Sequence, residues 1–241
     1  MNKLIVCFAL VFSLPFSALA TDNINFGFFD GSSLNIIFRN TLFDRDFKGG
    51  VRDRGEWGQA VMAKFSSGYT PGKVGVGVEG FGFYAFRLDG GRGRSGQGGI
   101  DFFKQDSDGR AAKDIARAGG AVNFKVSNTV LNYGEQTPTY PVLAYSDTRL
   151  LPEIYNGISV RSHDLEWLDF NAAHFTAEAR RSAAGRDNGR LNSIDVIGAD
   201  ITPIKSVRLS LYQADVEEYF TKYYASAVYT FPINKIFEFH A

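Results

Sequence analysis

Apolar and polar residues alternate along much of the chain with a period of two, which is the pattern of a β-strand with one apolar face. In residues 32–43, positions 34, 36 and 38 are apolar and Asn35 and Arg39 are polar. Residues 57–69 repeat this pattern. The segment 73–88 alternates over sixteen residues. That length exceeds a typical soluble strand but suits a tilted membrane-spanning strand, which needs about 9 to 11 residues and can extend past the bilayer.

The same pattern predicts nine strands in an all-β fold with no linker that would separate two domains. Both short and long connections join them, as in barrels that have short turns on one side of the membrane and longer loops on the other. The nine expected strands cover residues 32–43, 57–69, 73–88, 121–133, 154–161, 165–176, 193–201, 206–214 and 219–231.

Two architectures bury such faces in different ways. In a secreted β-sandwich the apolar faces meet each other and the polar faces meet water. In a membrane barrel the apolar faces meet lipid and the polar faces line an aqueous lumen. Aromatic residues near several strand ends, such as Trp167 and Tyr229, favour the barrel because its membrane interfaces carry aromatic girdles.

The N-terminus predicts a secretory signal peptide over residues 1–20, followed by the strand-forming region over residues 21–241. Lys3 precedes an apolar stretch, and Ala18 and Ala20 form a small-residue cleavage site. An uncleaved anchor is the alternative, but the stretch is shorter than a spanning helix and Pro15 interrupts it. The single cysteine, Cys7, would leave with the peptide, so disulfides are not expected to stabilise the mature chain.

Composition agrees with β-structure and narrows the expected partners. Aromatic residues make up 15% of the chain and there are 26 glycines, which favours strands and turns. The 26 basic and 26 acidic residues balance, so nothing global indicates a nucleic-acid partner. After residue 20 no apolar run is long enough for a spanning helix.

Charge gathers on the polar faces of the expected strands. In a barrel these positions would line the lumen, where basic side chains attract anions and pass them from site to site. Glu79, Asp169 and Tyr212 also lie on polar faces, so the lining is not uniformly positive. The expected lumen cations are Arg39, Lys64, Lys73, Lys125, Arg161, Arg208 and Lys222.

Enzymatic and metal chemistry are not expected. His163, His174 and His240 have no metal-ligand spacing. The pair His163 and Asp164 has no serine in a Gly-x-Ser-x-Gly elbow to complete a hydrolase triad. The glycine-rich residues 90–99 have no strand-to-helix context for a phosphate loop and suit a surface loop. The sequence therefore predicts no catalytic site, no metal and no cofactor.

Four segments together resemble the OprD family of substrate-specific outer-membrane porins, and the resemblance extends over nearly the whole mature chain. They are RNTLFDRDF (residues 39–47), EWGQAVMAKFSSGYTPGKVGVGVEGFG (56–82), SNTVLNYGEQTPTYPVLAYSDTRLLPEIYNGISV (127–160) and YFTKYYASAVYTFP (219–232).

The resemblance implies an antiparallel transmembrane barrel of eighteen strands, with a third outer loop that folds into the lumen as a constriction. Here that loop corresponds to about residues 134–153. It implies passive transport of small carboxylate solutes such as amino acids, with basic amino acids as the favoured class. It also assigns Tyr145, Ser146 and Asp147 to the solute-facing side of the loop.

The resemblance also implies a row of basic side chains on the wall opposite the loop. Alternation independently directs four cations inward, and these are Lys125, Arg161, Arg208 and Lys222. A register shift of one residue would turn each of them outward. Arg149 either joins this row or pins the loop through an ion pair with Asp147 or Glu153, and we favour pinning.

The chain departs from the family pattern in length. Nine strands are half of an expected eighteen and cannot close such a barrel. Three interpretations follow: a shortened N-terminal half that is inactive alone, a chain that assembles with a complementary partner or with itself, or a secreted β-sandwich solute-binding protein. The expected surroundings are outer-membrane lipid and lipopolysaccharide, and a full-length protein would be a monomer or a trimer.

Overall fold

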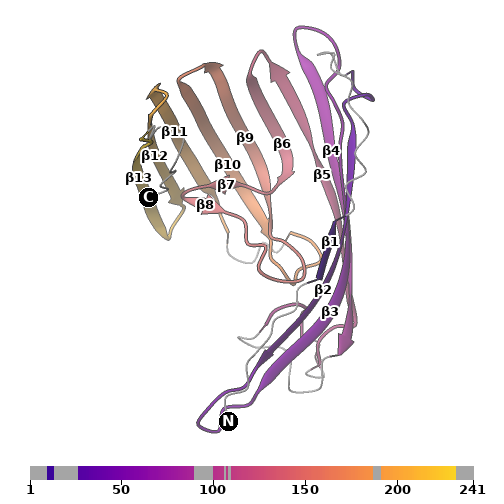
Figure 1. Ribbon diagram of the computed structural model, residues 1–241. Coiled ribbons are helices and arrows are strands. Elements are labelled where there is room, and N and C mark those ends of the chain that lie inside the picture. Colours follow the sequence, from indigo (N-terminus) through magenta and orange to yellow (C-terminus); the bar gives the residue numbers. More distant parts are fainter. Residues whose placement is uncertain are drawn as a thin grey trace.

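The computed structural model describes residues 27–89, 100–105, 107, 110–186 and 191–231, together with the backbone of residues 10–13. Within these residues one antiparallel sheet of eleven strands follows the order of the chain, and Figure 1 shows it curving around a hollow. The strands of this sheet are β1 (Leu10–Ser13), β2 (Ser33–Arg45), β3 (Arg54–Ser66), β4 (Gly75–Asp89), β5 (Asp114–Val126), β6 (Thr129–Gln136), β9 (Ile154–Leu165), β10 (Leu168–Ala179), β11 (Ile194–Ile204), β12 (Val207–Val216) and β13 (Phe220–Tyr229).

The two faces of the sheet differ as alternation predicts. On the convex outer face of β2, Leu34 and Phe38 are 54% and 44% exposed, whereas Arg39 lies on the inner face opposite Ala60 of β3. The register then carries the inner face from strand to strand around the sheet. Because the described strands form one curved sheet with an exposed apolar outer face, and not two sheets packed together, the β-sandwich alternative receives no support.

Three of the shortest connections share one edge of the sheet, and three long ones share the opposite edge. Two-residue turns join β5 to β6, β9 to β10, and β11 to β12. Longer connections follow β4, β6 and β10 at the other edge, and β1 at residues 10–13 pairs with β2. Most of the predicted signal peptide lies outside the described residues, and its cleavage stays a prediction.

The expected strand at residues 121–133 is wrong, because this segment is a hairpin. β5 ends at Val126, Ser127 and Asn128 form the turn, and β6 begins at Thr129. Ser127 has φ = 53°, a left-handed conformation that reverses the chain. A two-residue turn leaves Val126 and Thr129 paired on the same face, so the apolar pattern hides the reversal. The sheet therefore has ten strands after β1, not nine.

A second, two-stranded sheet lies in the connection between β6 and β9. It consists of β7 (Thr139–Tyr140) and β8 (Leu143–Ala144), and Figure 1 shows this hairpin crossing the hollow of the large sheet. The connection, residues 137–153, is called the inner loop below. The chain bends within β6 at Gly134, where φ is 130° and the pairing of β6 with β5 ends. A side chain there would lie 2.5 Å from the carbonyl oxygen of Gly120, so this bend requires glycine.

No helix within the described residues combines the length and apolar character needed to cross a membrane.

Candidate functional site

One end of the inner loop is anchored by apolar burial against the wall. Leu150 and Leu151 are fully buried and pack in a cluster with Met62 of β3, Phe83 of β4 and Phe102 of the β4–β5 connection. All the wall residues of this cluster are on the inner face. The C-terminal part of the loop is therefore docked on β3 and β4, inside the curve of the sheet.

The other end of the loop docks on the opposite part of the wall. Val142, in the turn between β7 and β8, is 3% exposed and packs with Tyr155, Phe175 and Tyr212 from β9, β10 and β12. Lys222 of β13 donates a hydrogen bond from Nζ to the Val142 carbonyl oxygen at 3.1 Å. The inner loop thus spans the hollow from β3 to β13.

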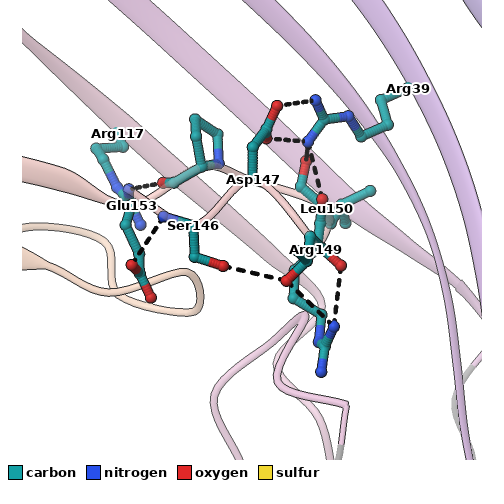
Figure 2. A network of polar contacts seen from close by, with 9 residues as sticks. Arg39, Arg117, Ser146, Asp147, Arg149, Leu150 and Glu153 are labelled. Carbon is teal, nitrogen blue, oxygen red and sulfur yellow. Dashed lines mark hydrogen bonds and ion pairs between the residues drawn. The ribbon is translucent and has the colours of Figure 1, made fainter. Parts of the chain in front are cut away.

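A charged pair holds the middle of the loop (Figure 2). The Arg39 guanidinium donates to both carboxylate oxygens of Asp147, at 2.6 and 2.8 Å, and to the carbonyl oxygen of Arg149 at 2.8 Å. The Arg39 side chain is only 15% exposed. This bidentate geometry is the strong form of a charge-assisted hydrogen bond. Asp147 was expected to face solute, whereas here its carboxylate is occupied by the wall.

Arg149 pins the loop, but not through either expected ion pair. Its Nε donates to the carbonyl oxygen of Ile100 at 2.6 Å, and its guanidinium lies 5.0 Å from the centre of the Phe43 ring. The expected partner Asp147 is taken by Arg39, and the other, Glu153, lies 3.6 Å from Arg181. Burial, followed by the nearby charges of Arg181 and Arg45, lowers the pKa of Arg149.

The remaining predicted loop residues mainly order the loop itself. The Ser146 amide donates to the Glu153 carboxylate at 3.0 Å, and the Glu153 amide donates to the Ser146 carbonyl oxygen at 2.9 Å. The Ser146 hydroxyl lies 3.1 Å from the Thr148 hydroxyl. Tyr145 packs against the second apolar cluster. These contacts close the loop on itself, with Asp147 at its turn.

Arg117 of β5 is a site residue that the sequence reasoning missed. It lies on the inner face, is 5% exposed, and donates to the Pro152 carbonyl oxygen at 2.8 Å. The alternation that places Ile115 and Ala121 inward also places Arg117 inward, but the strand expected in this region began only at residue 121. β5 in fact begins at Asp114.

The four predicted wall cations all lie on the inner face in this register. Lys125 pairs across from Gly75, and its Nζ is 5.5 Å from the centre of the Tyr69 ring. Lys222 binds the inner loop as described above. Arg161 and Arg208 are the open ones, with side chains 69% and 60% exposed. Whether any of the four guides solute stays a prediction.

Lys64 also faces inward, whereas Lys73 lies in a bend before β4 and not in a strand. The expected lumen row is therefore shorter than seven residues.

Acidic side chains accompany the open arginines. Asp169 is 3.5 Å from Arg161 and 3.0 Å from His163, and Asp200 is 3.1 Å from Arg208. Tyr212 donates its hydroxyl to Asp200 at 2.9 Å and accepts from Asn171 at 3.0 Å. The Tyr212 ring lies over Gly198 of β11, at a position that any side chain on Gly198 would overlap.

The two arginines, the two aspartates, Asn171 and Tyr212 line a pocket of about 610 Å³ between the start of the inner loop and the wall, most of whose lining residues come from β9 to β13. Loop residues Pro138 to Pro141 form one side, and the paired arginines and aspartates form the other. In the described part of the chain, no group of three or more His, Cys, Asp or Glu is arranged to hold a metal ion. The site is thus a recess with charges of both signs.

The family model "outer membrane porin, OprD family" matches residues 26–241. The chain belongs to the OprD family of outer membrane porins. The predicted family is therefore confirmed, as are the all-β porin fold and the outer-membrane location that goes with it. The members of this family are channels rather than enzymes.

Relatives in the OprD family match this chain over about half of their length. Porin D of Pseudomonas aeruginosa is 37% identical over 216 residues, which cover 86% of this chain and 48% of the relative. Porin-like protein GalP of Pseudomonas putida is 38% identical over 184 residues, which cover 75% of this chain and 43% of the relative.

Solved structures in the OprD family agree with the curved sheet. OccK9 (OpdG) of Pseudomonas aeruginosa superimposes with a TM-score of 0.80 at 30% identity, over 86% of this chain and 56% of that one. A BenF-like porin of Pseudomonas fluorescens Pf-5 gives a TM-score of 0.79 at 26% identity, with the same shares. OpdK of Pseudomonas aeruginosa, solved with vanillate, gives 0.77 at 30% identity and covers 86% and 55%.

Proposed function

We propose that this chain supplies part of the wall and the constriction of a passive outer-membrane channel for small carboxylate-bearing solutes. The observation that supports this proposal is the inner loop, which is docked at both ends and has a charged pocket beside it. A loop fixed across a lumen narrows the lumen without closing it, and the groups beside it then select among solutes.

The exposed arginines are the groups expected to attract carboxylates. Arg161 and Arg208 are each held from one side by an aspartate, which orients the guanidinium and leaves its other N–H donors available. Asp169 and Asp200 add acceptors for an ammonium or guanidinium group in the same pocket. This mixture of charges favours amino acids over simple anions, and an excess of acceptors would favour basic amino acids. The structure of the relative OpdK with vanillate, itself a small carboxylate, agrees with the carboxylate part of this proposal.

A closed pore requires more strands than the described sheet contains. Within the described residues β13 is hydrogen-bonded only to β12 in the large sheet, so its second edge is unpaired there. In lipid an unpaired edge costs several kcal/mol for each unsatisfied backbone group. We infer that a conducting form pairs this edge with further strands, from a longer chain or a second one. The exposed apolar outer face would contact outer-membrane lipid and lipopolysaccharide.

The test is transport in planar bilayers and liposomes, with the protein purified from the outer membrane. We expect uptake of arginine and small carboxylates to exceed uptake of neutral sugars of similar size. Arg161→Gln and Arg208→Gln should each lower carboxylate uptake several-fold, because each removes one exposed positive charge from the pocket. Arg52→Gln, in the exposed β2–β3 connection, is the matched control and should leave uptake unchanged.

The outcomes separate the alternatives. Current steps or selective uptake from the chain alone would refute the inactive-fragment interpretation. Absence of both, with recovery when a complementary C-terminal chain is co-expressed, would support it. Equal permeability to carboxylates and neutral solutes would overturn the proposed selectivity.

A further inference from the structure

The Arg117 side chain makes contacts with two loops that are far apart in sequence. From the inner face of β5 its guanidinium donates to the carbonyl oxygen of Pro152, at the end of the inner loop (Figure 2), and to those of Arg180 and Ala183 in the connection after β10. The described start of that connection, residues 180–186, is called the second loop below. One buried cation thus binds both loops.

The chemistry of this contact requires arginine. Five N–H donors in a rigid plane can serve three carbonyl oxygens at fixed angles, which the single ammonium of lysine cannot do from the same position. Among the described residues no carboxylate contacts the guanidinium directly, although Glu135 and Glu153 lie close enough to offset its charge. The site is therefore built to hold peptide carbonyls and not to pair with a free anion.

Two further ion pairs join the same elements. Arg181 of the second loop lies 3.6 Å from Glu153 of the inner loop, and Arg186 lies 3.6 Å from Glu135 at the end of β6. Both pairs are more exposed than Arg117, so solvent weakens them. The buried Arg117 contact is thus the main connection between the loops.

We propose that Arg117 is a positioning residue that joins the inner loop and the second loop into one body. The inner loop then cannot leave the wall without the second loop, so the width of the constriction depends on the second loop. This proposal uses the proposed function only in treating the inner loop as the constriction. It predicts a mechanical link that exists whether or not the chain conducts.

Hydrogen exchange on the purified chain in detergent tests the link without transport. Three amides report on the loops, because each is hydrogen-bonded within one of them: Tyr145 and Glu153 in the inner loop and Ala183 in the second. In Arg117→Met all three should exchange at least roughly tenfold faster, since each buried carbonyl loses a charged donor. Arg117→Lys should give an intermediate acceleration in both loops, and Arg52→Met, an exposed control, should give none.

Acceleration confined to one loop, or seen in neither, would overturn the proposal. If the amides throughout β10 to β12 of Arg117→Met also lose protection from exchange, the variant has unfolded. The link between the loops is then tested on the wild-type protein. In the wild type, the amides of both loops should share one denaturant dependence of exchange, which marks a single opening unit. Different dependences would overturn the link. If hydrogen exchange gives the results expected here but the protein shows no uptake, the proposed function is rejected and the link between the loops is kept.

Discussion

Replacement of Leu150 by alanine should release the inner loop while the wall stays folded. Leu150 is fully buried between Gly58 of β3 and Phe103, and a methyl group placed on Gly58 would lie 2.5 Å from its Cδ2. The change removes three carbon atoms from the contact. At about 0.8 kcal/mol per buried methylene plus a cavity term, the free energy that holds the loop on the wall should fall by about 3 kcal/mol. This raises the undocked population of the loop roughly 100-fold.

The assay is hydrogen exchange at the loop amides, with limited proteolysis as a second measure. Leu211→Ala is the matched control, because Leu211 is 55% exposed on the outer face of β12 and does not contact the loop. Faster exchange at Tyr145 and Glu153 in Leu150→Ala, with unchanged exchange in β10 to β12, is the expected result. Equal effects of the two substitutions would refute the idea that burial of Leu150 docks the loop.

Three further predictions concern contacts of the same wall. A double-mutant cycle with Arg39→Gln and Asp147→Asn should give a coupling of about 1 kcal/mol in loop opening, because the pair is bidentate and partly buried; additive effects would contradict this. Gly58→Ala should undock the loop much as Leu150→Ala does, which proteolysis can check. Gly198→Ala should displace the Tyr212 ring and lower the free energy of unfolding by about 1 to 3 kcal/mol, the usual cost of an overpacked site. An unchanged melting temperature would count against the contact between the ring and Gly198.

Alternation predicted the faces of most strands because the two sides of the sheet differ so strongly. On β2, β3 and β4 the expected inner and outer residues agree with the register, including Arg39 inside and Phe38 outside. Lipid-facing positions must be apolar and inner ones tolerate charge, so local sequence carries this information. The tight turn at Ser127 was not predicted, because the residues on both sides of it keep the same alternation.

Contacts between distant segments could not be predicted in the same way. Asp147 and Arg39 are 108 residues apart, and nothing near either residue specifies the other. The sequence indicated that a charged loop enters the hollow, but it did not show which charges the loop would use to hold itself there. The expected partners of Arg149 were wrong for the same reason, since its contact is the backbone of Ile100.

The cations of the wall fall into two groups, according to whether they donate hydrogen bonds to the inner loop. Arg39, Arg117 and Lys222 each donate to loop carbonyl oxygens. A carbonyl oxygen does not titrate, so it accepts these hydrogen bonds at any pH. Arg161 and Arg208 face the start of the inner loop across the pocket, each lies next to an aspartate, and both stay largely exposed. A basic residue that is saturated by backbone acceptors has little capacity for solute. If the chain forms part of a channel as proposed, we expect selectivity to depend on the few cations that the loop leaves free, and the position of the constriction to depend on the others.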